Sequence, residues 1–575
     1  MASLYPKKVN GQTYWYLREM AWIAGKPRLK SERYLGKAED IAAAVEAADR
    51  AIAPERTRHL SFGDVAAVWG MLTRLDVAGI VDEVVGPRRS DAGASVGLYL
   101  ALAALNRLVD PCSKLAFAEW WMTTAADRFT KIRTSVLDHR RFWDATHAIT
   151  AAHLVEIERR VTTAMVETFD LDVSAVALDM TNFATYIDTG NEMASLAQRG
   201  KAKQKRNDLR LVGLGLVVTR DGGIPLVSHA YPGNRHDVTQ FTAVLDELGR
   251  RYLALTAKAA TDATGPENGL GKVTVVFDAG QNSAANFEHL RSVGIGYVTS
   301  LPPSDHAELL ALPRRRRAVV DAQRFGGLTA LQTRKDVFGA DTRVILTHSP
   351  TLHAGQARGF DQTLAKTEAK LADLAARLER GKTRRARGAV TAEVTTICKD
   401  TWVRRVLTWD LTGDTPTTLR LSWAIDEAAR TLLEEDLFGK RVLVTNREDW
   451  PIGDVVAAYR SQSEAEFGFR QLKDPEAVSF SPMHHWTDQA IRVHVYTCVL
   501  ALQIAHLMRR HTAHAGLQLS VRALLTQLAG IQETVLIYPS TAGRPKARRQ
   551  LTETSPQQQK LIDTFDLNKW APQKT

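Results

Sequence analysis

The stretch Val-Ala-Leu-Asp-Met-Thr at residues 176–181 and the stretch Val-Val-Phe-Asp-Ala-Gly at residues 275–280 decide the fold. In each, an apolar run with the composition of a core strand ends in an aspartate, Asp179 or Asp278. Acidic side chains are rarely buried unless they are paired or metal-bound. A helix-capping aspartate at an exposed strand end is the alternative for either residue alone. Two such strands favour a shared site.

Further apolar runs surround these two stretches and alternate between strand and helix periodicity. The strand-like runs are 173–178, 209–218, 224–230, 273–277 and 297–301, and the helical runs are 238–252 and 283–292. Three consecutive strands followed by alternating helix and strand indicate an α/β fold in which helices cover a mixed sheet.

The chain has 575 residues, which is too long for one domain of about 150 residues. We expect a small β-hairpin unit over 1–60, a helical domain over 61–170, a core over 171–301 that helices over 449–515 complete, an insertion over 302–448, and a C-terminal region over 516–575. For the helical domain, DNA reading and a plain scaffold role are equally open. The basic, polar tail beyond Gly543 is expected to be mobile.

The block 302–448 interrupts the pattern of the core. Its strand-like pieces are 342–347, 402–410, 418–423 and 441–445. Between them lies a charged helix, 361–380, which ends in the basic run Lys382 to Arg387. Its leucines lie near one face, so the helix suits an antiparallel hairpin or a projecting arm. We therefore expect a β-rich insertion that carries a long helical arm.

The composition indicates which class of molecule the protein binds and in which cellular compartment it works. Lys and Arg outnumber Asp and Glu by 75 to 64, a net charge of +11, which favours a polyanionic partner. Three isolated cysteines argue against a disulfide framework or a zinc ribbon and fit a reducing cytoplasm. The most apolar stretch, 491–508, is shorter and more polar than a membrane span of about 20 residues. We expect a buried helix there, no export signal and no membrane partner.

Glu466, in the helical stretch 459–473, is the candidate for a third carboxylate. At about 100° per residue, the residues that share its face of the helix are Tyr459, Gln462, Glu466, Arg470 and Lys473. A solvated ion pair between Glu466 and Arg470 is the alternative. Three carboxylates would complete a site for Mg²⁺. The nearby Glu464 points to the opposite side and is expected to pair with Arg460 in solvent.

These motifs resemble those of the DDE insertion-sequence transposases, in particular the subgroup with a Tyr/Arg/Glu/Lys signature around the third carboxylate. Asp179 and Asp278 match the first and second aspartates. The third motif is matched at the correct intervals by Tyr459, Glu466 and Lys473. The resemblance runs from about residue 10 to residue 510.

The sequence departs from the subgroup at two positions. Gln462 stands where the signature has Arg, and Ser481 stands where related sequences usually carry Arg before the proline. The resemblance therefore does not decide whether Gln462 and Ser481 contact phosphates. The three carboxylates of the family are all present.

The resemblance implies a ribonuclease H-like catalytic core in which Asp179, Asp278 and Glu466 hold two Mg²⁺ ions, with Mn²⁺ as an alternative. The residues that would bind DNA are Tyr459, Arg470, Lys473, Lys203, Arg206 and His485. The implied partner is double-stranded DNA, as transposon ends and target, and the implied active complex is a homodimer in a bacterial cytoplasm, associated with the nucleoid.

The implied reaction is metal-dependent strand cleavage at transposon ends, followed by 3′-OH strand transfer into target DNA, with DNA hairpins during excision. Two alternatives stay open. One is a ribonuclease H-like endonuclease that only hydrolyses DNA, and the other is an inactive DNA-binding regulator derived from a transposase.

Overall fold

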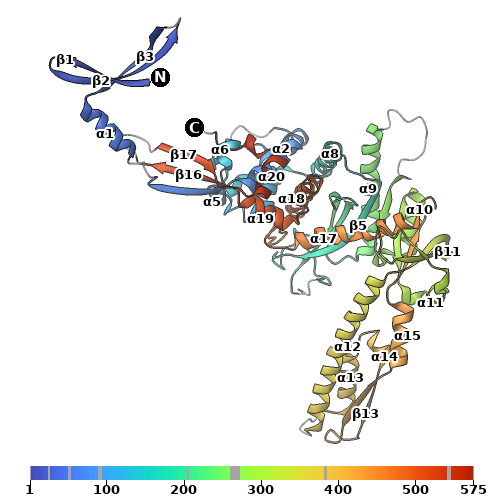
Figure 1. Ribbon diagram of the computed structural model, residues 1–575. Helices are drawn as coiled ribbons and strands as arrows, with labels where there is room; N and C mark the ends of the chain where they lie inside the picture. The colour runs from blue at the N-terminus through green and yellow to red at the C-terminus, as the bar shows by residue number, and fades with distance from the viewer. Residues whose placement is uncertain are drawn as a thin grey trace. The chain divides into compact units, whose positions relative to one another are not determined.

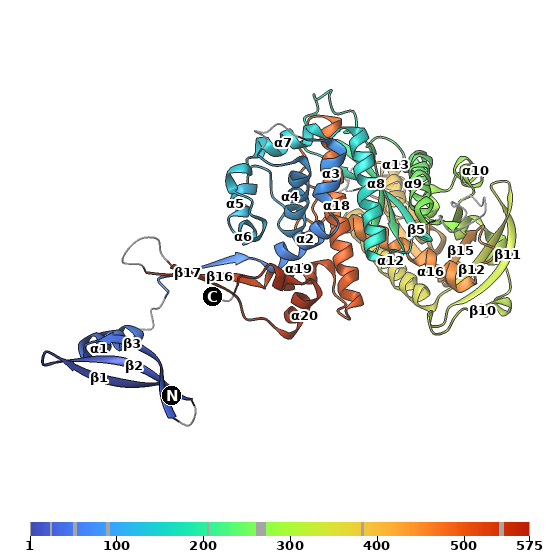
Figure 2. The same cartoon turned by 90° about the horizontal axis from the view of Figure 1, so that it is seen from above.

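The computed structural model describes residues 2–23, 26–49, 54–87, 93–203, 206, 208–259, 272–380, 385–539 and 546–573. The chain forms two compact units. One consists of Met1–Ala67, Ala118–Thr134 and Ala523–Thr575, and the other of Val68–Phe117 and Ser135–Arg522. Both aspartate motifs lie in the second unit, whose helices and strands can be followed in Figures 1 and 2.

A mixed sheet forms the centre of the second unit. Among the described residues it has nine strands, in the order β10-β11-β12-β15-β9-β8-β5-β6-β7. These strands are β5 (Ala175–Ala184), β6 (Leu211–Thr219), β7 (Pro225–Pro232), β8 (Thr274–Val276), β9 (Gly296–Leu301), β10 (Ala318–Val319), β11 (Thr329–Val337), β12 (Ala340–His348) and β15 (Lys440–Thr445). β8 lies parallel to both β5 and β9, whereas β6 and β7 are antiparallel. The predicted mixed α/β sheet is confirmed.

Helices cover both faces of the central strands, which explains why these strands are continuous apolar runs. On one face, Val275 and Phe277 belong to a core cluster with α9 (Asp237–Ala259) and α10 (Ala284–Val293). On the other face, Val276 belongs to a cluster with α16 (Ile452–Arg460). Adjacent residues of β8 thus enter different cores, as the alternation of side chains along a strand requires.

The remaining helices complete the two units. Those before β5 are α2 (Gly63–Arg74), α3 (Val77–Val85), α4 (Val96–Val109), α5 (Phe117–Trp121), α6 (Ala126–Thr130), α7 (His139–Ala148) and α8 (Ala151–Phe169). After β9 comes the short α11 (Ala307–Leu310), and near the C-terminus come α18 (Asp488–His514) and α19 (Val521–Ala529).

Among the described residues, α18 alone is long and apolar enough to cross a membrane, so the helix is longer than the stretch 491–508 suggested, whereas the expectation of a buried helix is confirmed. Its most apolar window is 94% buried inside the protein, as for a core helix.

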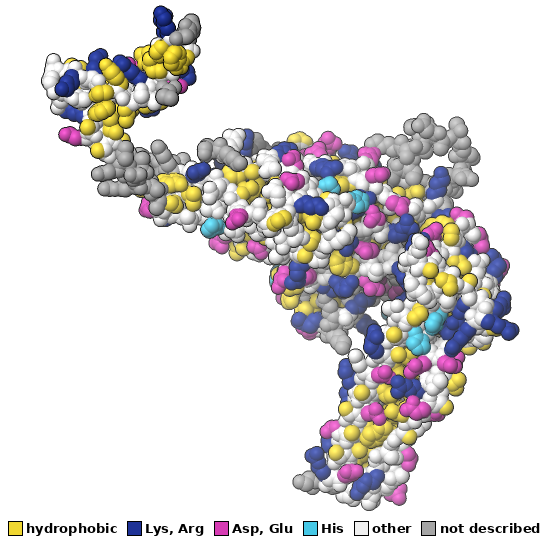
Figure 3. Space-filling view, viewed as in Figure 1, with side chains coloured by type: hydrophobic (Ala, Val, Ile, Leu, Met, Phe, Trp, Pro, Cys, Tyr) yellow, Lys and Arg dark blue, Asp and Glu magenta, His cyan; other side chains and the backbone are white. Residues whose placement is uncertain are grey.

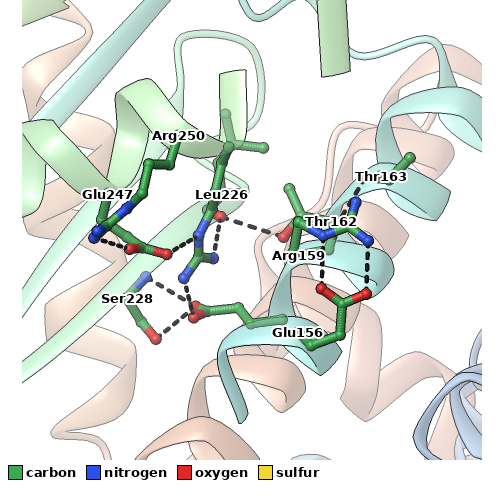
Figure 4. A network of polar contacts seen from close by, with 10 residues as sticks. Glu156, Arg159, Thr162, Thr163, Leu226, Ser228, Glu247 and Arg250 are labelled. Carbon is green, nitrogen blue, oxygen red and sulfur yellow. Dashed lines mark hydrogen bonds and ion pairs between the residues drawn. The ribbon is translucent and has the colours of Figure 1, made fainter. Parts of the chain in front are cut away.

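A buried ion pair joins α8 to the sheet and to α9. Glu158 on α8 pairs with Arg251 on α9 at 2.6 Å, and both side chains are less than a tenth exposed. Glu158 also accepts hydrogen bonds from the Ser228 backbone and hydroxyl, and Arg251 donates to the Leu226 carbonyl and to Glu247. Figure 4 shows Ser228, Leu226 and Glu247 converging there. Both charged groups of the pair thus have further hydrogen-bond partners, which a buried ion pair requires.

The segment 302–448 is partly continuous with the sheet. β10, β11, β12 and β15 extend the sheet beyond β9, whereas the chain between β12 and β15 forms a separate lobe with its own core. The lobe contains α12 (Pro350–Glu379), α13 (Arg387–Ile397), α14 (Val403–Val406), α15 (Glu427–Leu437), β13 (Leu407–Thr412) and β14 (Arg420–Ile425). Figure 1 shows it leading away from the sheet.

The long helix of this lobe begins earlier than expected. α12 starts at Pro350 because Ser349 caps it and proline fits the first helical turn. Of the basic run after it, Lys382 and Arg384 lie outside the described residues. Arg387 donates to the carbonyls of Leu411 and Gly413, so it ties α13 to the β13–β14 hairpin.

The described residues of the first unit form two three-stranded sheets. One consists of β1 (Ala2–Val9), β2 (Gln12–Ile23) and β3 (Lys26–Gly36), followed by α1 (Ala38–Asp49). In the other, β16 (Gln532–Tyr538) lies between β4 (Arg56–Ser61) and β17 (Lys546–Leu551).

The expectation of a mobile tail beyond Gly543 was wrong. β17 lies in the sheet, and α20 (Pro556–Thr564) follows it. The fully buried Glu533 pairs with Arg128 at 2.6 Å and with Arg549 of β17 at 2.5 Å. A basic residue that looked like part of a charged tail thus neutralises a buried carboxylate.

Candidate active site

Asp179 lies in the interior of β5, which corrects the expectation that it ends the strand. β6 pairs with β5 from Val176 to Ala184, so the strand continues for five residues after the aspartate. On its other edge, β5 pairs with β8 only from Ala175 to Ala177. Asp179 therefore lies beyond the point at which the neighbouring strand β8 has ended.

Asp278 lies two residues after the end of β8 and shapes the turn there. Its carboxylate accepts a hydrogen bond from the Gly280 backbone N–H at 3.0 Å, at the start of a short 3₁₀ turn, Ala279–Gln281. The side chain is half-buried. Asp278 thus has the capping role that was considered as an alternative, and it also lies beside Asp179.

The pKa of Asp179 is raised to about 6, mainly by burial and also by the negative charges of Asp278 and Glu466. The Met180 backbone N–H, at 2.7 Å, and the positive charge of Lys203 act in the opposite direction. Asp278 and Glu466 therefore both lie within electrostatic reach of Asp179.

Glu466 is an exposed residue of α17 (Gln462–Leu472), which packs against β5. The helical stretch predicted over 459–473 is interrupted at Ser461, whose hydroxyl donates a hydrogen bond to the Ala458 carbonyl at 2.6 Å. Two helices, α16 and α17, thus replace one.

Lys473, at the end of α17, connects this helix to the strand that carries Asp179. Its ammonium group donates to Thr181 Oγ1 at 2.9 Å and lies 5.5 Å from the centre of the Phe183 ring. Burial and the charge of Lys203 lower the pKa of Lys473, whereas the charge of Asp179 raises it. A cation is therefore held beside the carboxylates.

In the part of the chain that the structure describes, no three His, Cys, Asp or Glu side chains lie close enough together to hold a metal ion. The donor set nevertheless fits Mg²⁺ or Mn²⁺, since all three side chains offer carboxylate oxygens. The raised pKa of Asp179 also means that the protein leaves its negative charge poorly compensated, as a cation site requires.

A cleft of about 770 Å³ adjoins Glu466. Tyr459 also lines it, with a hydroxyl that donates to Ser300 at 2.9 Å and accepts from Arg441 at 3.1 Å. The cationic residues that line the cleft are Arg324, Arg441 and Arg460. Nothing in the sequence indicates that Arg324 and Arg441 belong to this site, because they come from separate segments outside the motifs, and Arg460 was expected only to pair with Glu464.

The remaining residues predicted to bind DNA divide into three groups. Lys203 lies beside Asp179, donating to the Met180 carbonyl at 2.6 Å and pairing with Asp237 at 2.8 Å. Arg206 pairs with Asp208, and Arg470 is exposed on α17. His485 is not brought to this site. It lines a small separate cavity with Arg107 and Lys114, and its ring lies 5.0 Å from that of His494.

Glu464 has a different partner from the one expected. It pairs with Arg509 of α18 at 2.7 Å, whereas Arg460 lies over the ring of Phe325. The expectation of a local pair in solvent was wrong because α18, distant in sequence, offers a cation on the side of α17 away from Glu466. Glu464 thus joins two helices and stays apart from the carboxylates.

Residues 174–504, more than half of the chain, match the family described as Transposase DDE domain. No match was found among curated protein sequences. Among solved structures, the piggyBac transposase synaptic complex with hairpin DNA, determined by cryo-electron microscopy, aligns over 83% of this chain and 82% of that chain, with 8% identity and a TM-score of 0.33. The family match spans both aspartate motifs and α17, and the chain belongs to the family of transposases with a DDE domain.

Proposed function

We propose that this chain is the DNA transposase of an insertion sequence, which cuts transposon ends and joins the freed 3′-OH to target DNA. The observation that supports it most is the placement of Asp278 beside Asp179, with Glu466 on the helix that packs against β5, in a chain of the DDE family. The strand order β7-β6-β5-β8-β9, antiparallel and then parallel, is the one expected of a ribonuclease H-like core.

In this proposal Asp179, Asp278 and Glu466 hold two divalent ions, Mg²⁺ or Mn²⁺. Such ions would supply the positive charge that activates a water molecule or a 3′-OH and stabilises the leaving oxygen. The aspartates are fixed by the sheet and by the turn at Gly280, whereas the exposed Glu466 can change rotamer at small cost. Glu466 is therefore the ligand we expect to move when the site is filled.

The cations around the carboxylates would bind and orient DNA. Lys473 and Lys203 lie on one side of Asp179, and Arg441, Arg460 and Arg324 line the cleft on the side of Glu466. Phosphate contacts of this kind fix the register of a DNA strand without reading its sequence. The Tyr459 hydroxyl, held by Ser300 and Arg441, would help to place the strand that is cut.

The resemblance stated above extends the proposal to a homodimer in which each subunit acts on one transposon end, with hairpin intermediates and a cytoplasmic location. It also assigns DNA contacts to Arg206, Arg470 and His485. His485 is the weakest of these assignments, since it lines a separate cavity.

The test is incubation of the full-length protein with Mg²⁺, a target plasmid and DNA ends of the element, either intact to detect nicking or pre-cleaved to detect joining. We expect nicked ends and joined products that disappear with EDTA. Hydrolysis without joined product would identify a nuclease. Binding of the ends without cleavage in Mg²⁺ or Mn²⁺ would identify a regulator.

A further inference from the structure

A second cavity, of about 680 Å³, lies at the base of the lobe between β12 and β15. Its basic and imidazole lining consists of Arg314, Arg317, Arg430, Lys440, His348 and His353. Figure 3 shows His side chains beside clustered Lys and Arg side chains where the lobe leaves the sheet. The carboxylates of the active site do not line it.

Two of these cations are already paired with acids, of which Glu434 and Glu435 line the cavity and Asp361 does not. Arg430 pairs with Asp361 at 2.7 Å and with Glu434 at 3.3 Å. Arg314, which is largely exposed, lies 3.9 Å from Glu435. The remaining glutamate of the lining, Glu427, is exposed to solvent.

Arg317 and Lys440 are left without such partners. Two guanidinium nitrogens of Arg317, Nε and one Nη, are buried and make no hydrogen bond with the described residues. Lys440 is only 4% exposed. Within the described ranges its ammonium group forms no ion pair, and Asp436 and Glu435 act on it by their charge alone. Unpaired buried cations are destabilising, so their presence points to an anion that the protein binds.

The surroundings of the two cations favour an anion as well. Burial and the charge of Arg317 lower the pKa of Lys440 to about 8, and burial and Arg314 lower the pKa of Arg317. His348 stands opposite Lys440 in the β12–β15 register. The N-terminus of the 30-residue helix α12, at Pro350, also lines the cavity, with its partial positive charge.

We propose that this cavity binds a phosphate group through Arg317 and Lys440. A phosphate has several acceptor oxygens, so it can satisfy the fork of Arg317 and the ammonium group of Lys440 together. The source that accords with the proposed function, on which this part of the inference rests, is the backbone of a bound DNA strand. A free phosphate compound has the same chemistry.

The first experiment uses the full-length protein and inorganic phosphate, titrated at constant ionic strength and pH 7 by calorimetry. Arg317→Met and Lys440→Met should each weaken phosphate binding at least about tenfold, as expected for loss of a charge-assisted hydrogen bond. The matched controls are Arg315→Met and Arg316→Met, because both arginines are exposed in the same turn. They should bind phosphate as the wild type does.

A second readout separates binding from simple misfolding. Without phosphate, Arg317→Met and Lys440→Met should melt at or above the wild-type temperature, because each removes an uncompensated buried cation. The proposal is overturned if the wild type binds no phosphate, if the control variants lose as much affinity, or if both Met variants melt lower without phosphate.

The salt dependence of duplex binding identifies the source of the phosphate. If it belongs to DNA, each Met variant should reduce the slope of log K against log salt concentration by about 1. An unchanged slope, with phosphate binding lost, would assign the cavity to a free phosphate compound. Neither outcome depends on cleavage, so a failure of the proposed reaction would be seen separately in the nicking assay.

Discussion

Asp179 and Asp278 occupy aligned positions on neighbouring parallel strands. Ala177 is the last residue of β5 that pairs with β8, and its partner is Val276, so each aspartate follows its strand's last paired residue by two positions. Neighbouring strands lie about 4.8 Å apart, and residues two positions further on point to the same face. The sheet itself therefore places two negative charges side by side.

This arrangement predicts how stability responds to pH and metal. The folded-state pKa of Asp179, about 6, is above its unfolded value, so its stabilising contribution is present at low pH and is lost as the pH rises through 6. Mg²⁺ should restore it, because the ion compensates the ionised carboxylate. We expect Mg²⁺ to raise the melting temperature above pH 6 and to have little effect near pH 5, where protons compete with the ion.

Asp179→Asn is the control for this measurement by scanning fluorimetry. It removes the buried charge, so it should melt at or above the wild-type temperature in EDTA and lose the Mg²⁺ response. If the Mg²⁺-induced shift in melting temperature has equal size at pH 5 and pH 8, or if Asp179→Asn retains it, Asp179 does not bind the metal.

The buried pair between Glu158 and Arg251 predicts a large effect on stability. Arg251→Met leaves Glu158 buried without its cation and should lower the free energy of unfolding by about 3–5 kcal/mol. Arg250→Met removes a pair to Glu247 in which the arginine is 71% exposed, and should cost less than about 1 kcal/mol. Urea unfolding compares the two variants, and equal losses would show that the pair does not hold α8.

Lys473 is expected to contribute to catalysis more than to DNA affinity. Lys473→Met removes a preorganised cation beside Asp179, so it should slow nicking about 100-fold. Lys473→Arg should retain more activity because it keeps the charge. Affinity for the ends should change only a few-fold, since many phosphate contacts share it. Single-turnover nicking and gel-shift assays check both, and an equal loss in Met and Arg variants would argue against a role for the charge.

The central strands and the three carboxylates could be predicted from sequence because local patterns encode them. Apolar runs mark β5 and β8, and helix phase separates Glu466 from Glu464. The end of β5 was missed because Thr181 and Asn182 are polar, as at a strand end, yet β6 pairs with them both.

Contacts between distant segments could not be predicted in this way. Arg509 lies 45 residues from Glu464, and nothing near either residue indicates their pair. Likewise, the basic composition around Arg549 suggested a mobile tail. The sequence does not show that Arg549 pairs with the buried Glu533, because the two residues meet only when β16 and β17 pair in the sheet. Arg317 and Lys440 also meet only in the folded chain.

The identity of the catalytic glutamate tests the account most directly. Glu466 acts on the titration of Asp179, whereas Glu464 pairs with Arg509 on another side of α17. The measurement is Mg²⁺-dependent nicking of end-containing DNA by Glu466→Gln and Glu464→Gln, with melting temperature recorded for both. We predict that Glu466→Gln eliminates nicking without loss of stability, and that Glu464→Gln cuts within a few-fold of wild type even though it weakens the contact to α18. Normal nicking by Glu466→Gln, with Glu464→Gln folded but inactive, would contradict it.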